Sequence, residues 1–370
     1  MSSCGIISEY NPLHNGHIYQ IEKAKELSGA DFMIAVMSGN FVQRGEPAVI
    51  DKWERAEAAI HNGIDVVIEL PYFFASQSAS HFADGAMQVF RTAGIDSICF
   101  GSECGNLENL QEIADTPINP DHLHESMNGG MSYPKAYSLL TSSMYPNDLL
   151  AVCYLRTLKG SGIQPYLVQR TSGYLDAEIN KNASALAIRH ALKNHLSLAG
   201  STPMEEILKN STLHFSEMYY PYLRTFLTVS SPEHLRQLFL FSEGIEYLLQ
   251  KNAMKYEKYD DFINACTNYR YTASRIRRCC LQALNQVTKK EAEGLPAYDT
   301  VRVLAFGEHG RKWLAEQRKK ETKIASRFAD VPDAWRQLEY RTSLMYASIL
   351  KEEERKRILS LEIGGAHYIK

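Results

Sequence analysis

Two histidines near the N-terminus are the residues best suited to chemistry. His14 and His17 are three residues apart in the first turn of a helix that is predicted to open around His14, so both lie on one helix face. Asn15 and Gly16 leave backbone N–H groups within reach of a ligand, and a helix N-terminus favours anions. Imidazoles at this position can donate to phosphate oxygens and add positive charge as a leaving phosphate becomes more negative. The stretch therefore predicts a triphosphate site with His14 and His17 as catalytic residues; two ordinary helix-capping histidines are the alternative.

The chain just before these histidines has the pattern of a strand and a turn. Residues 4–8 read as a short buried strand, and Asn11-Pro12 turns the chain because the residue before a proline is disfavoured in a helix. The H-x-G-H spacing after a first strand resembles the signature of the nucleotidyltransferase superfamily, which includes the class I aminoacyl-tRNA synthetases.

Length and composition indicate a soluble globular protein of two domains. The chain has 370 residues, of which 45% are hydrophobic and 22% are charged. No apolar run reaches the ~18–20 residues that a membrane span requires, and the N-terminus lacks the basic segment of a signal peptide. Seven cysteines occur with no C-x-x-C spacing, which predicts neither a disulfide framework nor a zinc site and suggests a reducing cytoplasm.

Charge is distributed unevenly along the chain. Residues 1–190 contain 12 Lys and Arg against 21 Asp and Glu, a net of −9, whereas residues 191–370 contain 28 against 22, a net of +6. Such an imbalance suggests that the second half binds a polyanion. Random variation of surface charge is the alternative that counting alone leaves open.

Residues 1–190 alternate short apolar runs with amphipathic helical stretches. The predicted strands are residues 4–8, 32–37, 65–70, 97–101 and 165–168. The predicted helices are residues 17–27, 52–62, 81–93, 107–115, 133–140 and 147–158, with Asn147 or Asp148 as the cap of the last. This alternation predicts an α/β domain with a doubly wound parallel sheet, in which ligands bind beyond the carboxyl ends of the strands.

Polar residues follow several of these strands. Arg44, in the loop after the second strand, can meet a carboxylate or a phosphate, although a solvated surface arginine is equally compatible. Glu69 ends the third strand, and Gly101 ends the fourth, where it would allow a base or ribose close to the backbone. Ser184 at a helix start and Arg189 beyond it can surround phosphates with a hydroxyl, N–H groups and a guanidinium.

The strand pattern ends near residue 196. The later segments all read as helices: residues 204–209, 217–228, 233–251, 259–269, 273–287, 297–306, 311–317 and 335–358. Residues 262–290 contain six bases and no acid, with Tyr269 and Tyr271 interleaved, and residues 311–327 add seven bases against two acids. Bases neutralise phosphates and tyrosines stack on unpaired bases, so two such segments in one domain predict RNA binding. A solvated helix face with core tyrosines is the alternative for either segment alone.

Four blocks in order resemble the tRNA(Met) cytidine acetate ligase family: residues 5–17, 38–47, 65–71 and 100–103. The resemblance continues through residues 146–148, 183–189 and 275–278 and so covers nearly the whole chain. It implies a nucleotidyltransferase-like, ATP-binding catalytic domain over residues 1–195 and an α-helical, basic tRNA-binding domain over residues 196–370. It also implies a cytoplasmic enzyme that activates acetate as acetyl-adenylate, releases pyrophosphate, and acetylates the exocyclic amine of the wobble cytidine in elongator methionine tRNA.

The same resemblance implies the site residues. For ATP these are Ile7, Ser8, Glu9, Tyr10, Asn11, Pro12, Leu13, His14, Asn15, Gly16, His17, Ile18, Tyr19 and Gln20, with Gly101, Asn147, Arg170, Ser184 and Arg189. For tRNA they are Arg275, Arg277 and Arg278. Leu13 stands where an aromatic residue is usual, and Leu186 stands where the superfamily often has a hydroxyl residue, which removes one expected phosphate contact. Mg²⁺ is expected with ATP as part of the substrate, with no metal held by the protein alone.

Two other functions remain compatible with the sequence. A small-molecule adenylyltransferase or pantoate-type ligase would use the same histidines, and its helical domain would serve only for oligomerisation. A non-enzymatic RNA-binding protein on a decayed scaffold is the other, although His14, Gly16 and His17 are intact. Neither a membrane nor DNA is an expected partner. RNA binding should weaken steeply with salt, which separates the ligase from the first rival.

Overall fold

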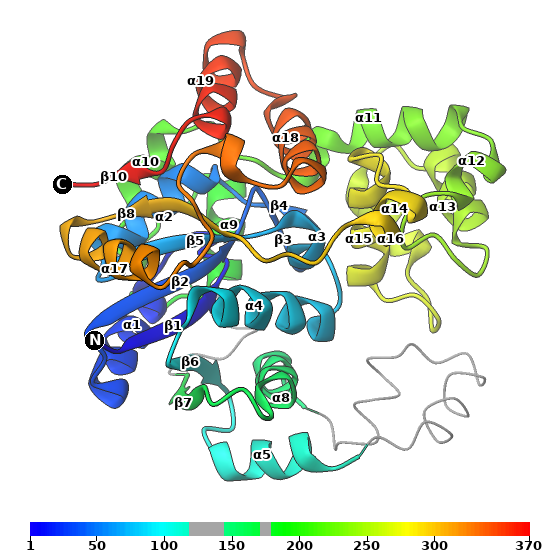
Figure 1. The fold of residues 1–370 in the computed structure, drawn as a ribbon. Helices are drawn as coiled ribbons and strands as arrows, with labels where there is room; N and C mark the ends of the chain where they lie inside the picture. The colour runs from blue at the N-terminus through cyan, green and yellow to red at the C-terminus, as the bar shows by residue number, and fades with distance from the viewer. Residues whose placement is uncertain (118–143, 171–178) are drawn as a thin grey trace.

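The computed structural model describes residues 1–117, 144–170 and 179–370, and within them a central sheet is covered by helices on both faces (Figure 1). The sheet follows the order β10-β8-β5-β2-β1-β6-β7, with β9 paired to β8, and β3 and β4 form a separate hairpin. The strands are β1 (Ser3–Ser8), β2 (Phe32–Ser38), β3 (Phe41–Val42), β4 (Glu46–Pro47), β5 (Val66–Leu70), β6 (Ser97–Ser102), β7 (Gln164–Gln169), β8 (Val301–Phe306), β9 (Ile324–Ala325) and β10 (His367–Tyr368). Every pairing in the main sheet is parallel except that of β5 with β8.

Helices connect the strands and then form a separate body. In the first half they are α1 (Asn15–Ser28), α2 (Lys52–His61), α3 (Tyr72–Ala75), α4 (Ala79–Ala93), α5 (Leu107–Asp115), α8 (Pro146–Leu158) and α9 (Ala185–Lys193). In the second half they are α10 (Glu205–Asn210), α11 (Ser216–Val229), α12 (Pro232–Arg236), α13 (Ile245–Lys255), α14 (Tyr259–Cys266), α15 (Ala273–Leu284), α16 (Lys289–Gly294), α17 (Glu308–Lys319), α18 (Asp333–Ala347) and α19 (Glu352–Ile363). None of the described helices is long and apolar enough to span a lipid bilayer.

Strand β2 shows why the sheet is buried on both sides. Phe32, Ile34 and Val36 pack into one core, with α4 and α8, whereas Met33 and Met37 pack into the other, with α1, α2 and α9. Side chains alternate along a strand, so an all-apolar strand requires a cover on each face. The doubly wound α/β fold predicted from the sequence is confirmed.

Strand β1 lies at the switch point of the sheet. It pairs with β2 on one side and with β6 on the other, and the chain runs outward from it in both directions. The connections on the two sides cannot both fill the space beyond the carboxyl end of β1, so a crevice forms there. The loop from β1 into α1 ends at His14, and the first turn of α1 contains His17; both open onto this crevice.

The prediction of a helix over residues 297–306 is wrong. Residues Val301–Phe306 form β8, which pairs antiparallel with β5, and β10 near the C-terminus then pairs with β8. A fully buried strand reads as a continuous apolar run, and periodicity alone cannot distinguish it from a buried helix. Residues 196–370 are therefore not entirely helical, and the sheet contains strands from both sides of residue 195.

The helical body formed by α11 to α15 has its own apolar core. It lies beside the sheet rather than on either face of it (Figure 1). Gly45, at the tip of the β3–β4 hairpin, has φ +81°, and a Cβ there would come within 2.6 Å of the backbone nitrogen of Arg278 in α15. The hairpin after β2 is therefore in close contact with the basic helix.

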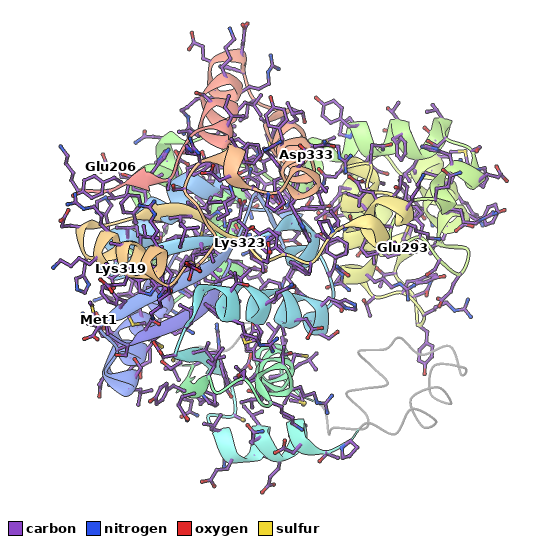
Figure 2. All side chains as sticks on the ribbon, viewed as in Figure 1. Met1, Glu206, Glu293, Lys319, Lys323 and Asp333 are labelled. Atoms are coloured by element: carbon purple, nitrogen blue, oxygen red, sulfur yellow. The ribbon has the colours of Figure 1, made fainter. Side chains whose placement is uncertain are left out.

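Other helix boundaries also differ from prediction. The single helices predicted over residues 233–251 and 335–358 are each divided in two, and the helix predicted over 133–140 lies outside the described residues. The two basic segments are also separated, since α17 packs on the sheet while α15 belongs to the helical body. Figure 2 shows Lys319 beside the sheet, on the opposite side of the molecule from Glu293.

Buried ion pairs attach the C-terminal strands and helices to the sheet. Lys52 Nζ lies 2.6 Å from Glu69 Oε1 and 2.7 Å from Glu362 Oε2, and Arg302 lies 2.5 Å from Glu69 Oε2 and 2.8 Å from Glu362 Oε1. All four side chains are at most 4% exposed. Glu69 therefore ends β5 as part of a structural cluster, and removing one member would leave an uncompensated buried charge.

Glu339 lies beside this cluster, and no cation among the described residues forms an ion pair with it. Burial, followed by the charge of Glu69, raises the pKa of its carboxyl group to about 8, and its Oε1 accepts a hydrogen bond from Tyr72 N–H at 2.7 Å. The opposite holds for Glu362, because Arg302 and Lys52 outweigh its burial and lower its pKa to about 2. One carboxyl group is thus held neutral and the other ionised at the same location.

Replacing Glu339 by Gln should make stability less dependent on pH. In the unfolded chain Glu339 ionises near its ordinary pKa of 4.5, so between about pH 5 and 8 the folded protein binds more protons and its free energy of unfolding falls as pH rises. Gln keeps an acceptor for Tyr72 N–H but does not ionise. Denaturant melts of E339Q and wild type should therefore diverge in favour of E339Q from pH 5 to 8.

Glu362→Gln is the matched comparison. It removes an ionised partner of Lys52 and Arg302, so it should destabilise the fold by about 3–5 kcal/mol across the same pH range. Parallel stability curves for E339Q and wild type would contradict the assignment of Glu339 as the neutral group.

Candidate active site

The two histidines cap helix α1 through their ring nitrogens. His14 is the N-cap residue, and its Nδ1 accepts a hydrogen bond from Gly16 N–H at 3.0 Å. The Nδ1 of His17 accepts from His14 N–H at 3.2 Å, which closes a reciprocal capping box. A neutral imidazole that accepts at Nδ1 carries its proton on Nε2, so both rings keep an Nε2–H donor. Gly16 is required here, because a Cβ would lie 2.8 Å from Cε1 of His14.

Both imidazoles are uncharged in this site. Burial, reinforced by the charges of Arg170 and Arg189, lowers the pKa of His14 to about 3. Burial, followed by the neighbouring His14 and then Arg170, holds the pKa of His17 well below its ordinary value. The ring centroids are 3.8 Å apart, a distance at which two charged rings would repel strongly. The expectation that these histidines supply positive charge is therefore wrong for the free site, where they act as neutral N–H donors.

The first backbone N–H groups of α1 are already used within the protein. Asn15 N–H donates to Ser201 O at 3.1 Å, Gly16 N–H to the ring of His14, and His17 N–H to His14 O at 2.8 Å. The prediction that Asn15 and Gly16 offer these donors to a ligand is wrong, because the His14 ring caps the helix and residue 201 packs against its start.

Helix α9 provides the available N-terminus instead. Ser184 is the N-cap residue and its Oγ accepts from Ala187 N–H at 3.2 Å, as the sequence predicted. Within the described part of the chain, the N–H groups of Ala185 and Leu186 have no hydrogen-bond partner, and both residues line the cavity described below. This helix start therefore offers two donors to an anion.

A cavity of about 180 Å³ opens beyond the carboxyl ends of β1 and β6. Eleven of the lining residues were predicted from the sequence as nucleotide contacts: Ile7, Ser8, Glu9, His14, His17, Gln20, Gly101, Asn147, Arg170, Ser184 and Arg189. Arg44, the candidate of the loop after β2, also lines it. The site thus assembles residues from β1, α1, β6, α8, β7 and α9, which are spread over 180 residues of chain.

The charges around this cavity favour an anion. Among its described lining residues, Arg44, Arg170 and Arg189 face one acid, Glu9, which gives a formal net charge of +2. Arg189 is fixed in place, because it donates to Asn11 O at 2.8 Å and lies 3.8 Å from Glu46 Oε2. The α9 N-terminus and the imidazole Nε2–H groups add dipoles of the same sign.

Several predicted nucleotide contacts do not line the cavity. Tyr10 and Leu13 are buried in the core under the sheet, and Asn11 Oδ1 accepts from Val49 N–H at 2.7 Å. Asn15 uses its side chain to hold the carbonyls of Lys181 and Gly200. The remaining predicted residues outside the lining are Pro12, Gly16, Ile18 and Tyr19. These residues belong to the loop and helix start beside the cavity but do not form its surface.

The apolar wall of the cavity was missed by the sequence analysis. Phe82 of α4, Phe100 of β6, and Leu150 and Tyr154 of α8 line it together with Gln43. In the sequence these four apolar residues have the pattern of buried helix and strand faces, which predicts ordinary core positions. Only the tertiary structure shows that they face a cavity. An apolar wall with few polar groups is the usual surround of a bound ring.

Arg55 is a second residue that the sequence did not single out. Its fully buried guanidinium donates to Glu9 O at 2.5 Å, to Ser38 O at 3.1 Å and to Gly39 O. One side chain on α2 therefore holds the carbonyls that follow β1 and β2, at the edge where the site forms. Helix α2 also contains Lys52, Glu54 and Glu57, so the local sequence gives no signal that Arg55 is buried.

Glu103 and Asp148 fix the other edge of the cavity. Asp148 Oδ1 accepts from Ser102 Oγ at 2.5 Å and from Glu103 N–H at 2.9 Å, and Asn147 Nδ2 donates to Glu103 Oε1 at 2.6 Å. Helix α8 begins after Tyr145 as its N-cap residue, so the prediction of a cap by Asn147 or Asp148 is wrong. Both side chains instead anchor the loop after β6, next to Gly101 at the end of that strand.

The three arginines predicted to bind tRNA all lie in α15, where Arg275 and Arg277 pair with acids and Arg278 is partly buried. Arg277 is 2.9 Å from Glu46 Oε1 and Arg275 is 3.6 Å from Glu243 Oε2. Burial lowers the pKa of Arg278 to about 10. Arg270, in the loop before α15, is exposed, and Tyr269 beside it is 49% exposed, whereas Tyr271 is buried.

Comparison with known proteins places this arrangement in context. Residues 1–360 match the HIGH Nucleotidyl Transferase family. The tRNA(Met) cytidine acetate ligase of a Geobacillus species is 34% identical over 98% of both chains, and that of Exiguobacterium sibiricum is 37% identical over 96% of both. The structure also resembles Thermotoga maritima TmcAL bound with alpha-thio ATP, with 32% identity, full coverage of both chains and a TM-score of 0.86, and the apo form with a TM-score of 0.89.

Replacing His17 by Ala should remove one neutral donor from the cavity. We expect acetate-dependent exchange of pyrophosphate into ATP to fall about 10²–10³-fold, the usual effect of losing one donor to a developing charge. His61, an exposed histidine on α2, is the matched control, and His61→Ala should leave the exchange rate unchanged. An exchange rate for folded H17A close to wild type would contradict the assigned role.

Proposed function

Because the chain belongs to the tRNA(Met) cytidine acetate ligase family of HIGH nucleotidyl transferases, we propose that it uses ATP to acetylate a cytidine of methionine tRNA. The acceptor is the exocyclic amine of the wobble cytidine in the elongator tRNA, and the acyl donor is acetate. The observation that carries the proposal is the cavity beyond β1 and β6, where two neutral imidazoles, three arginines and a free helix N-terminus converge.

In the first step acetate attacks ATP. An acetate oxygen forms a bond to the α-phosphorus, the bond from that phosphorus to the bridging oxygen breaks, and pyrophosphate leaves with the electron pair. Negative charge then grows on the phosphate oxygens. The Nε2–H groups of His14 and His17, the guanidinium groups of Arg170 and Arg189, and the N-terminus of α9 stabilise that charge without having to reorient.

Mg²⁺ is expected to bind the triphosphate rather than a site made by the protein alone. Across residues 1–117, 144–170 and 179–370, no group of three or more His, Cys, Asp or Glu side chains is placed to hold a metal ion. The cavity lining offers Glu9 as a single carboxylate, and its Oε1 accepts from Gln43 N–H at 2.9 Å. A cation there would obtain its other ligands from phosphates and water, as Mg²⁺ commonly does.

In the second step the cytidine amine attacks the acetyl group. Its nitrogen forms a bond to the carbonyl carbon, the bond from that carbon to the adenylate oxygen breaks, and AMP leaves with the electron pair. The amine loses one proton to solvent or a nearby carboxylate. A cytidine must be unpaired and splayed from its loop to reach a cavity below the protein surface.

The tRNA is expected to contact the helical body next to α15. Arg270 and Tyr269 are exposed just before this helix, where a cation can meet a phosphate and a ring can stack on a base. Arg275, Arg277 and Arg278 follow them in α15. Arg277 pairs with Glu46 and the backbone of Arg278 lies against Gly45, so α15 is held against the β3–β4 hairpin, whereas Arg275 pairs with Glu243 inside the helical body.

Purified protein should form acetylcytidine in elongator methionine tRNA only when ATP and acetate are both present. Nucleoside analysis by mass spectrometry of the digested tRNA gives the readout, and a tRNA with uridine at the wobble position is the matched control. If ATP and acetate exchange pyrophosphate while tRNA neither binds at low salt nor acquires acetyl groups, a small-molecule ligase would replace this proposal.

A further inference from the structure

A second cavity of about 190 Å³ lies next to the nucleotide cavity. Leu186 and Arg189 of α9 line both cavities, so the two spaces adjoin across one turn of this helix. Its other walls come from β4 and from α11, α14 and α15 of the helical body. The second cavity is therefore the space where the catalytic part and the basic helix meet, directly behind the phosphate-binding end of α9.

The charges of the second cavity differ from those of the first. Three acids, Glu46, Glu217 and Asp260, are balanced by Arg189, Lys193 and Arg277, so the formal net charge is zero. All six of these groups pair with one another: Lys193 with Glu217 and Asp260, and Glu46 with Arg277 and Arg189. Such a lining offers hydrogen-bond donors and acceptors without favouring a charged ligand, whereas the lining of the nucleotide cavity, with a net charge of +2, favours an anion.

The shape and composition of the second cavity suit a small flat ring. Phe215 and Tyr259 contribute aromatic surface, and stacking on an aromatic side chain is the common way to hold an unpaired base. The volume is below the ~300–1,000 Å³ of pockets for drug-sized ligands. Cytosine has an amine donor and ring acceptors but no net charge, so it matches both the polarity and the size of this lining.

Acetate and phosphate match this lining less well. An anion would have to displace one of the three carboxylates from its cation, whereas the nucleotide cavity already provides an excess of positive charge. The position of the second cavity also suits the acceptor, because Leu186 and Arg189 line both cavities and a base in the second would lie next to the adenylate in the first.

Building on the function proposed above, we propose that this second cavity receives the acceptor cytosine base. The carboxylates of the lining accept from its exocyclic amine, the cations donate to its ring oxygen and nitrogen, and Phe215 and Tyr259 cover its faces. Arg277 then acts at the wall of the acceptor site and positions Glu46, which also reaches Arg189 in the nucleotide cavity.

Filling the second cavity should separate the two half-reactions. Ser216, at the start of α11, lines this cavity only, and Ser216→Trp places a large side chain there. We expect acetate-dependent pyrophosphate exchange to stay within about twofold of wild type, while acetyl transfer to tRNA falls at least ~tenfold, mainly in kcat. Thr225→Trp, at an exposed position of the same helix, is the matched control and should change neither rate.

A second variant fills the same cavity from another wall, so the proposal can still be tested if the first variant does not fold. His190→Trp on α9 should give the same separation of rates. Normal acetyl transfer by folded S216W and H190W would overturn the proposal, as would loss of exchange in both, since the cavity would then belong to acetate activation. If wild type forms no acetylcytidine, the proposed function itself fails, which is a different result.

Discussion

The reciprocal cap made by His14 and His17 is the interaction on which the site depends. Each ring accepts a backbone hydrogen bond at Nδ1, so each is fixed in orientation and in tautomer before any ligand arrives. Burial and nearby arginines keep both rings neutral, which leaves two fixed Nε2–H donors. Gly16 is small because the His14 ring occupies the space where a Cβ would be. A preorganised neutral donor does not have to reorient when charge develops on a phosphate.

The sheet edge around this cap is held by charges that are satisfied inside the protein. Arg55 joins the loops after β1 and β2 through their carbonyls, and Asp148 does the same for the loop after β6 through N–H and hydroxyl donors. Farther out, Lys52 and Arg302 share Glu69 and Glu362, which attaches the C-terminal strands and helices to the end of β5. The edge that binds a ligand is thus fixed from both sides, and the helical body contacts it through the β3–β4 hairpin.

Local sequence patterns predicted much of the first half of this structure. The histidine spacing, the apolar strands and the Ser184 cap depend on neighbours within a few residues, and all three were predictable. Contacts between distant residues were not. Arg302 is buried in a strand because it meets Glu69, 233 positions earlier in the chain, and no local periodicity reports such a partner. The use of the α1 N–H groups by Ser201 O and by the His14 ring was hidden for the same reason.

The central claim is that acetate attacks the α-phosphorus of ATP in the cavity beyond β1 and β6. The exocyclic amine of the cytidine then attacks the carbonyl carbon of the acetyl group. The most direct measurement is the fate of oxygen from [¹⁸O]acetate during acetyl transfer to tRNA, followed by mass spectrometry of the AMP. The account predicts one labelled oxygen in each AMP, because the bond between carbon and the adenylate oxygen breaks in the second step. Unlabelled AMP, with the label in pyrophosphate or phosphate, would contradict it.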